Sequence, residues 1–139
     1  MIDPNNVPPI ADNELLARFI TQSKQFRPRD QSVKPDLFIP FLLTEVSVTR
    51  HREATPEELW RVGRTVAMLR QQTLYGRSDV QVSDCAIDPL SVVPDPILPP
   101  KEPYNPNHAN IAGFPPAKDD QKAFAIKIAH KASNGSTKI

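Results

Sequence analysis

Short segments of the chain alternate between apolar and polar side chains, as half-buried strands do. In residues 44–50, Val46 and Val48 are separated by polar residues, so the two valines would share one face of a strand. Residues 79–85 repeat this pattern and predict a second strand. Residues 90–93 predict a short third strand, and the prolines that follow would restrict it to the edge of a sheet.

Three other segments space their apolar residues as a helix does. The clearest begins at residues 55–58 (TPEE), where a capping threonine, a proline and a glutamate favour a helix start. Its apolar residues recur to about residue 72, and Gly63 among them indicates a break or close packing. Residues 12–22 predict a shorter helix. Residues 117–132 predict a C-terminal helix with an acidic first turn and a basic last turn, as the helix dipole favours.

The proline content indicates which kind of loops connect these elements. Proline fixes φ and lacks a backbone donor, so 16 prolines against 4 glycines predict long, extended loops. Residues 94–106 contain six of these prolines and predict a stiff connector. We expect one small α+β domain over residues 12–132, with two or three strands, a middle helix and a C-terminal helix. Residues 1–11 would form a flexible N-terminal arm, and residues 133–139 a flexible tail.

Charge and cysteine content narrow the class of protein. The net charge is only +1, yet all nine arginines lie between Arg18 and Arg77, which predicts an arginine-rich face. The alternative is that these arginines are solvated or paired with acids. The single cysteine, Cys85, excludes an internal disulfide and suits a reducing compartment, and we expect it to be buried and unreactive. No apolar run approaches the ~20 residues that span a bilayer, so we expect a cytoplasmic protein without a membrane partner.

Sequence patterns for a metal or a cofactor are missing. The four glycines do not cluster, which excludes the common nucleotide-binding loops, and no Gly-x-Ser-x-Gly elbow is present. One cysteine and three scattered histidines lack the spacing of a zinc site. We therefore expect no metal and no cofactor.

The most unusual segment is residues 107–115, where a histidine and an amide precede a glycine turn that leads into the last predicted helix. Helix N-termini attract anions, so His108, Asn110 and Lys118 could together hold a phosphate. His108 could then act as a general acid or base. In the alternative interpretation, His108 and Asn110 satisfy backbone groups of an irregular loop.

Four arginines are further candidates for ligand binding. Arg27 and Arg29 lie in a proline-containing loop, and Arg50 and Arg52 lie at the end of the first predicted strand and just beyond it. Loops and strand ends often carry binding residues, and guanidinium groups suit phosphate or carboxylate. These arginines would form the arginine-rich face if folding brings them together.

Several blocks of the chain resemble those of a family of short bacterial proteins. The blocks are residues 26–28 (FRP), 34–40 (KPDLFIP), 45–50 (EVSVTR), 55–63 (TPEELWRVG) and 108–119 (HANIAGFPPAKD). They span most of residues 26–132, so the resemblance implies a single domain. No activity is established for that family, and the resemblance therefore implies no function, cofactor or catalytic residue.

These features favour a binding module over an enzyme, because they contain no convincing catalytic set. The first hypothesis is a non-enzymatic accessory subunit of a bacterial assembly. It would engage a phosphate-bearing ligand (nucleic acid or nucleotide), or an acidic surface of a protein partner, through the arginine-rich face. The alternative is a small phosphodiesterase or nuclease, such as a toxin, with His108 as the general acid or base. A purely structural protein is the third possibility.

Overall fold

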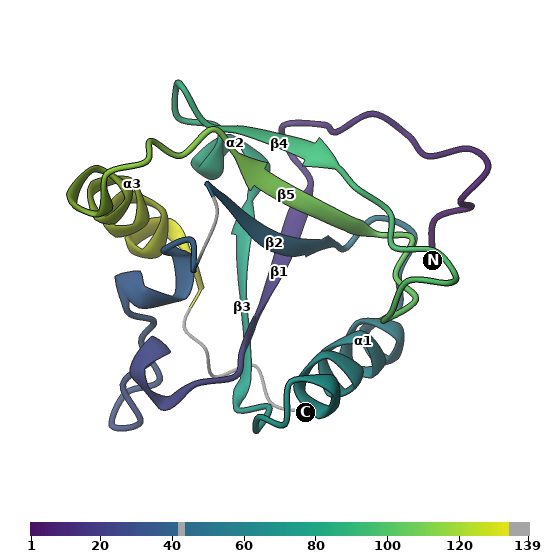
Figure 1. The fold of residues 1–139 in the computed structure, drawn as a ribbon, viewed down its shortest axis with the longest axis horizontal. Coiled ribbons are helices and arrows are strands. Elements are labelled where there is room, and N and C mark those ends of the chain that lie inside the picture. Colours follow the sequence, from purple (N-terminus) through teal and green to yellow (C-terminus); the bar gives the residue numbers. More distant parts are fainter. Residues whose placement is uncertain (42–43, 134–139) are drawn as a thin grey trace.

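The computed structural model describes residues 1–41 and 44–133 of the chain. These residues form a five-stranded antiparallel sheet with the strand order β3-β1-β2-β5-β4 (Figure 1). The strands are β1 (Leu15–Ile20), β2 (Glu45–Arg50), β3 (Gly76–Gln81), β4 (Ser91–Pro94) and β5 (His108–Ala112). The helices are α1 (Pro56–Leu69), α2 (Val82–Cys85) and α3 (Lys118–Lys131), with short 3-10 helices η1 (Ser23–Gln25) and η2 (Pro35–Phe38). The prediction of an α+β domain is confirmed, but two or three strands is too low a number.

The prediction of a helix over residues 12–22 is wrong, because this segment contains strand β1. Leu16 and Ile20 face the main core, whereas Phe19 packs on the other side of the sheet against Gly63 of α1. A strand that is covered on both faces loses the apolar–polar alternation of a half-buried strand. Its apolar residues then fall at spacings that are also found in helices.

Residues 108–112, predicted as part of an irregular loop, form strand β5. This strand pairs with β2 on one side and with β4 on the other. The segment HANIA contains a single β-branched residue, so local sequence gives little indication of a strand. The second predicted strand is also displaced: β3 ends at Gln81, and residues 82–85 form the short helix α2.

The elements with strong local signals agree with the prediction. Strand β2 buries Val46 and Val48, and β4 lies at the edge of the sheet. At the start of α1, the Thr55 hydroxyl accepts from the backbone N–H of Glu58 (3.1 Å), and the Thr55 N–H donates to Glu58 Oε1 (2.9 Å). This is the capping box that the sequence predicts, and it defines the first turn of the helix.

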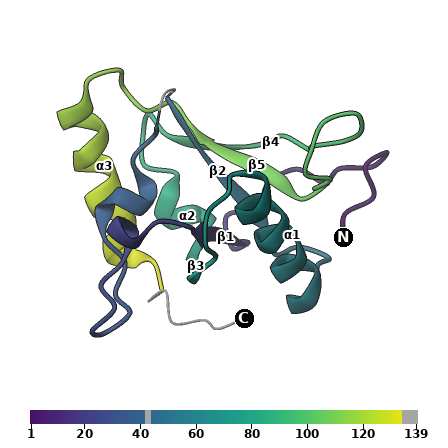
Figure 2. The ribbon, with the colours of Figure 1, turned by 60° about the horizontal axis from the view of Figure 1, so that its bottom comes forward.

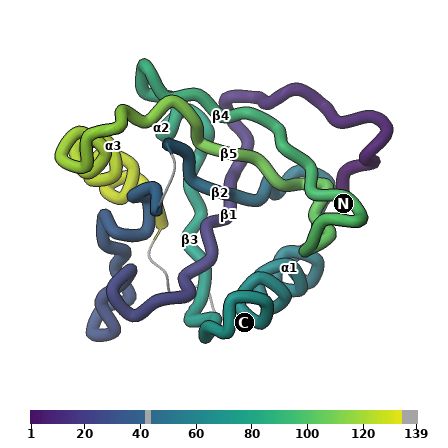
Figure 3. The backbone as a smooth tube through the Cα atoms, in the orientation of Figure 1, coloured from purple at the N-terminus to yellow at the C-terminus, as the bar shows by residue number. Residues whose placement is uncertain are grey.

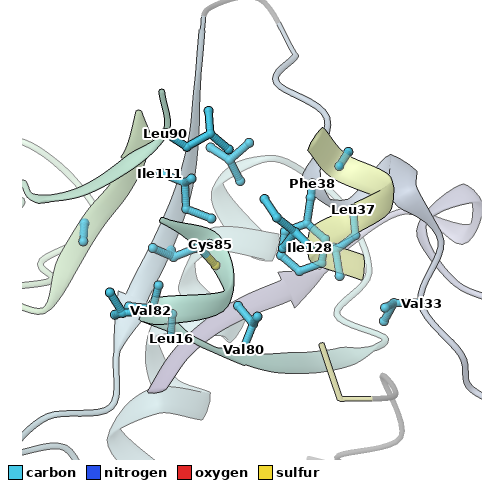
Figure 4. Packing of buried hydrophobic residues seen from close by; sticks show 14 of the residues in the cluster. Leu16, Val33, Leu37, Phe38, Val80, Val82, Cys85, Leu90, Ile111 and Ile128 are labelled. Carbon is cyan, nitrogen blue, oxygen red and sulfur yellow. The ribbon is translucent and has the colours of Figure 1, made fainter. Parts of the chain in front are cut away.

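The main core lies on one face of the sheet, under α2, α3 and η2 (Figure 4). It brings together Leu16 and Val80 from the sheet, Cys85 from α2 and Ile128 from α3. Helix α1 lies on the other side of the strands, away from α3 (Figure 2). A Cβ atom added at Gly63 would lie 2.7 Å from the ring of Phe19, so α1 approaches the sheet closely at this glycine.

Residues 1–11, predicted as a flexible arm, run along the domain and contact it at several points (Figure 3). The side chain of Ile2 is 1% exposed, and its N–H donates to Asn107 Oδ1 at 2.8 Å. The carbonyls of two prolines in this segment accept hydrogen bonds from Arg50. These contacts connect the start of the chain to β2 and to the segment before β5.

The proline-rich residues 94–106 fold back on themselves, since Ile97 and Asn105 form an antiparallel bridge. Of the predicted tail, Ser133 hydrogen bonds to strand β3, and residues 134–139 lie outside the described part of the chain. Within residues 1–41 and 44–133, no helix has both the length and the apolar character needed to cross a bilayer.

Candidate functional site

Strands β1 and β2 pair over a short distance and then separate. Their paired residues are Leu16 with Arg50 and Ala17 with Thr49. Beyond these positions β1 continues beside β3, and β2 continues beside β5. Arg18 follows Ala17 directly, so it lies at the point where the sheet divides.

The guanidinium group of Arg18 is held at this division by two backbone carbonyls. Its Nε donates to the carbonyl of Leu37 (2.9 Å), and its Nη1 donates to the carbonyl of Ser47 (3.1 Å). Among the described residues, no carboxylate lies within 4.0 Å of this group. Burial, together with the positive charge of Arg70, lowers the pKa of Arg18 to about 10. The side chain therefore keeps its charge at neutral pH without an acidic partner.

Two pockets meet at Arg18. The first, here named the α1 pocket, has a volume of about 330 Å³ and lies between α1, the sheet and the proline-rich loop. The second, here named the polar pocket, has a volume of about 690 Å³ and extends towards η1, η2 and the start of α3. Arg18, Ser47 and Arg70 line both pockets, so the two are adjacent, and together they are here named the hollow.

The polar pocket is rich in cations. Its charged side chains are Arg18, Lys24, Arg70, Lys118, Asp36 and Glu45, so cations outnumber carboxylates by two. The ammonium group of Lys118 donates to the carbonyls of Pro40 (3.0 Å) and Phe41 (3.3 Å), which hold it beside the pocket. Gln72 also lines the pocket, and its buried Oε1 has no hydrogen-bond partner among the described residues. An amide can present either its oxygen or its NH₂ group, so Gln72 could donate to an anion.

His108 lines the α1 pocket with a fixed tautomer. Its Nδ1 lies 2.7 Å from the carbonyl oxygen of Asp95 and 3.4 Å from that residue's carboxylate. Because a carbonyl only accepts, Nδ1 carries the hydrogen and Nε2 has a free lone pair. Burial lowers the pKa of His108 below its ordinary value of 6.5, although the carbonyl and carboxylate of Asp95 oppose this effect. The imidazole is therefore neutral at pH 7.

The hydroxyl group of Thr49 adds a donor to the same pocket. Its oxygen accepts from the side-chain amide of buried Asn105 at 3.0 Å, which leaves the hydroxyl hydrogen free to donate. The α1 pocket thus presents a donor at Thr49 and an acceptor at His108 Nε2, beside the charged side chains of Arg18, Arg70 and Glu102, and its other walls are mainly apolar.

Arg50, predicted to bind a ligand, is instead completely buried. It donates from Nε and Nη2 to the carboxylate of Glu14 (both 2.8 Å), and to the carbonyls of Pro8 (2.8 Å) and Pro9 (3.1 Å). With 0% exposure it joins the N-terminal segment to β2 and does not face a ligand site. Arg52 is 41% exposed, and its Nη1 lies 3.8 Å from the same glutamate.

The other predicted residues are placed separately. Arg27 and Arg29 are exposed in the loop before η2, where Arg27 donates to the Ser32 hydroxyl at 3.3 Å. Asn110 donates to the Asp95 carboxylate at 2.9 Å. Of the residues predicted to form one site, His108 lines the α1 pocket and Lys118 lines the polar pocket. Arg18 lines both pockets, so these two residues are the nearest to a shared site. Neither pocket contains Arg27 or Arg50.

Sequence reasoning did not single out Arg18 as a site residue. The signal was present, because an arginine lies inside the apolar run LLARFI. In a helix such a residue would turn to solvent, whereas in a strand covered on both faces it is partly buried. Because the sequence predicts a helix here, Arg18 is not recognised from the sequence as a residue that lines both pockets.

Metal and thiol chemistry find little support within the described residues. No group of three or more His, Cys, Asp or Glu side chains in residues 1–41 and 44–133 is arranged to hold a metal ion. Burial, with the nearby charge of Asp84, raises the pKa of Cys85 to about 12. Its thiol stays protonated, which is the opposite of what a nucleophile requires.

Comparison of the chain with protein-family models, with curated proteins and with solved structures finds no match. The resemblance of the sequence blocks to a bacterial family thus stays a prediction, and the site is interpreted from its own chemistry.

Proposed function

We propose that this protein is a non-enzymatic binding module for a phosphate-bearing ligand, held in the hollow around Arg18. The observation that carries the proposal is the partly buried guanidinium group of Arg18, which has only carbonyl partners among the described residues. Withdrawing a charge from water, even in part, without an ionic partner costs free energy. A bound anion would supply the missing partner.

The donors around Arg18 suit a phosphate. A guanidinium group has five N–H donors, and the two carbonyl contacts leave Nη2 free. Arg70, Lys24 and Lys118 line the same polar pocket and would add charge-assisted hydrogen bonds. A dianion also reduces the repulsion between Arg18 and Arg70, which a neutral ligand cannot do.

Calorimetric titration with inorganic pyrophosphate tests this proposal on the full chain. We expect binding to weaken about tenfold or more in Arg70→Ala, because a hydrogen bond to a charged group contributes about 1.5–3 kcal/mol. Arg64→Ala is the matched control, since Arg64 is exposed like Arg70, lies on α1, the helix that Arg70 caps, and lines neither pocket. Equal affinities of the two variants, or no heat of binding in the wild type, would count against the proposal.

A second candidate function is phosphodiester hydrolysis with His108 as the general base. One observation favours it: the fixed tautomer leaves Nε2 as an acceptor in a pocket that also contains Arg18. Steady-state assays with bis(p-nitrophenyl) phosphate test this function. Turnover that His108→Gln removes, while the melting temperature is kept, would support an enzyme. No turnover by the wild type would leave the binding role as the better account.

A further inference from the structure

The α1 pocket is too apolar to serve a bare phosphate. Phe19, Val48, Val66, Leu69 and Ile97 contribute to its walls. Its volume of about 330 Å³ lies at the small end of the usual range for ligand pockets, about 300–1,000 Å³. Apolar walls of this kind gain stability when an apolar group displaces water from them. A phosphate at Arg18 would leave them in contact with water.

Two polar side chains of the α1 pocket, on residues that are paired between β2 and β5, suit a heteroaromatic ring. Thr49 presents a hydroxyl donor, and His108 presents Nε2 as an acceptor. A plain hydrocarbon would leave both groups without hydrogen-bond partners, which costs free energy. A flat ring with its own donors and acceptors satisfies both while it covers the apolar walls.

The residues that line both pockets define how such a ligand would be oriented. Arg18 and Arg70 line both pockets, so an anionic group beside them is adjacent to a ring in the α1 pocket. Lys24 and Lys118 lie only on the polar side. A ligand with a ring at one end and a phosphate at the other therefore matches the hollow, which is mainly apolar in the α1 pocket and rich in cations in the polar pocket.

We infer that the ligand is a nucleoside monophosphate or a nucleotide at the phosphorylated end of a nucleic acid, with its base in the α1 pocket and its phosphate beside Arg18. This inference rests on the proposed function and adds the identity of the ligand's second half. The two sources share one chemistry, a heteroaromatic base joined to a phosphate.

The test compares three classes of probe by calorimetry: inorganic phosphate, the set of common nucleosides, and the corresponding nucleoside 5′-monophosphates. We expect at least one monophosphate to bind about tenfold more tightly than inorganic phosphate, a difference of about 1.4 kcal/mol. A 5′-phosphorylated tetranucleotide that binds more tightly than every monophosphate would identify a nucleic-acid end as the source. The reverse order would identify a free nucleotide.

Variants of α1 separate the two halves of the ligand. Val66→Phe fills the α1 pocket and should reduce the affinity for the monophosphate to that for inorganic phosphate, which itself should not change. Met68→Phe is the matched control, because Met68 is 68% exposed on the same helix. If Val66→Phe melts early, Val66→Ala replaces it, and a several-fold loss for the monophosphate alone is expected.

The possible failures are distinguishable. If inorganic phosphate binds and depends on Arg70, but no monophosphate binds more tightly, then the inference about the base is overturned and the proposed function stands. If Val66→Phe weakens both probes equally, the ring does not occupy the α1 pocket. If neither probe binds, both the inference and the proposed function fail.

Discussion

Replacing Arg50 with methionine distinguishes a structural arginine from a ligand-binding one. Arg50 makes two hydrogen bonds to the Glu14 carboxylate and one to each of two proline carbonyls, all between 2.8 and 3.1 Å. Methionine fills much of the same space but donates nothing. The change would leave the Glu14 carboxylate, whose side chain is 7% exposed, without its nearest cation.

The expected cost is large compared with the stability of a domain of this size. Removing one partner of a buried ion pair typically costs about 3–5 kcal/mol, because the other charge stays buried and unpaired. Small domains have unfolding free energies of about 5–15 kcal/mol. A loss of this size corresponds to a fall of roughly 10–20 °C in the melting temperature.

Urea unfolding, followed by the fluorescence of the single tryptophan, measures this cost. Arg52→Met is the matched control: its side chain is 41% exposed and 3.8 Å from the same carboxylate, so its loss should cost less than about 1 kcal/mol. Pyrophosphate affinity should be unchanged in Arg50→Met at a temperature where it remains folded. A stability loss below about 1 kcal/mol would refute the assignment of Arg50 to a structural role.

Three further predictions follow from single residues. Burial raises the pKa of Glu14, but hydrogen bonds and the charge of Arg50 lower it more, so the net pKa lies below 4.5. The charged form of Glu14 therefore stabilises the fold above pH 4.5, and this stabilisation is lost as the pH falls through the lower pKa of the folded state. In Glu14→Gln, the free energy of unfolding measured by urea titration should fall less steeply with decreasing pH. Gly63→Ala should destabilise the fold by about 1–3 kcal/mol despite a better helix propensity, since the added Cβ meets the Phe19 ring; thermal melting checks this. Cys85 should resist a thiol reagent at pH 8 until urea unfolds the protein, because burial raises its pKa to about 12.

Elements with a local cause were predictable from the sequence. The capping box at Thr55 and Glu58 acts within four residues, and the alternation of Val46 and Val48 needs only one buried face. The close packing at Gly63 was one of two outcomes that the sequence allowed, and the contact with Phe19 decides between them. These features depend little on the rest of the chain.

Strands β1 and β5 could not be recognised because their causes are not local. Strand β1 is covered on both faces, so its residues carry no alternating pattern, and β5 takes its hydrogen bonds from β2 and β4. The candidate site likewise depends on contacts between residues that are distant in the sequence. Arg18, Arg70 and His108 are separated by tens of residues, and the division of the sheet brings them to one hollow.

Arg18 and Arg50 show why the sequence alone could not rank the arginines. Both lie in strands and both donate to backbone carbonyls, but Arg50 is fully buried and has a carboxylate partner, whereas Arg18 is partly buried and has none among the described residues. Removing one partner of a buried ion pair is strongly destabilising, and withdrawing a charge from water without an ionic partner also lowers stability. Any anion that binds only the folded state returns part of that stability, about 2.7 kcal/mol at a concentration one hundred times its dissociation constant. Arg18, unlike Arg50, thus has an ionic partner to gain from an anionic ligand, and this difference, rather than the density of arginines, is the reason why we propose the site at Arg18.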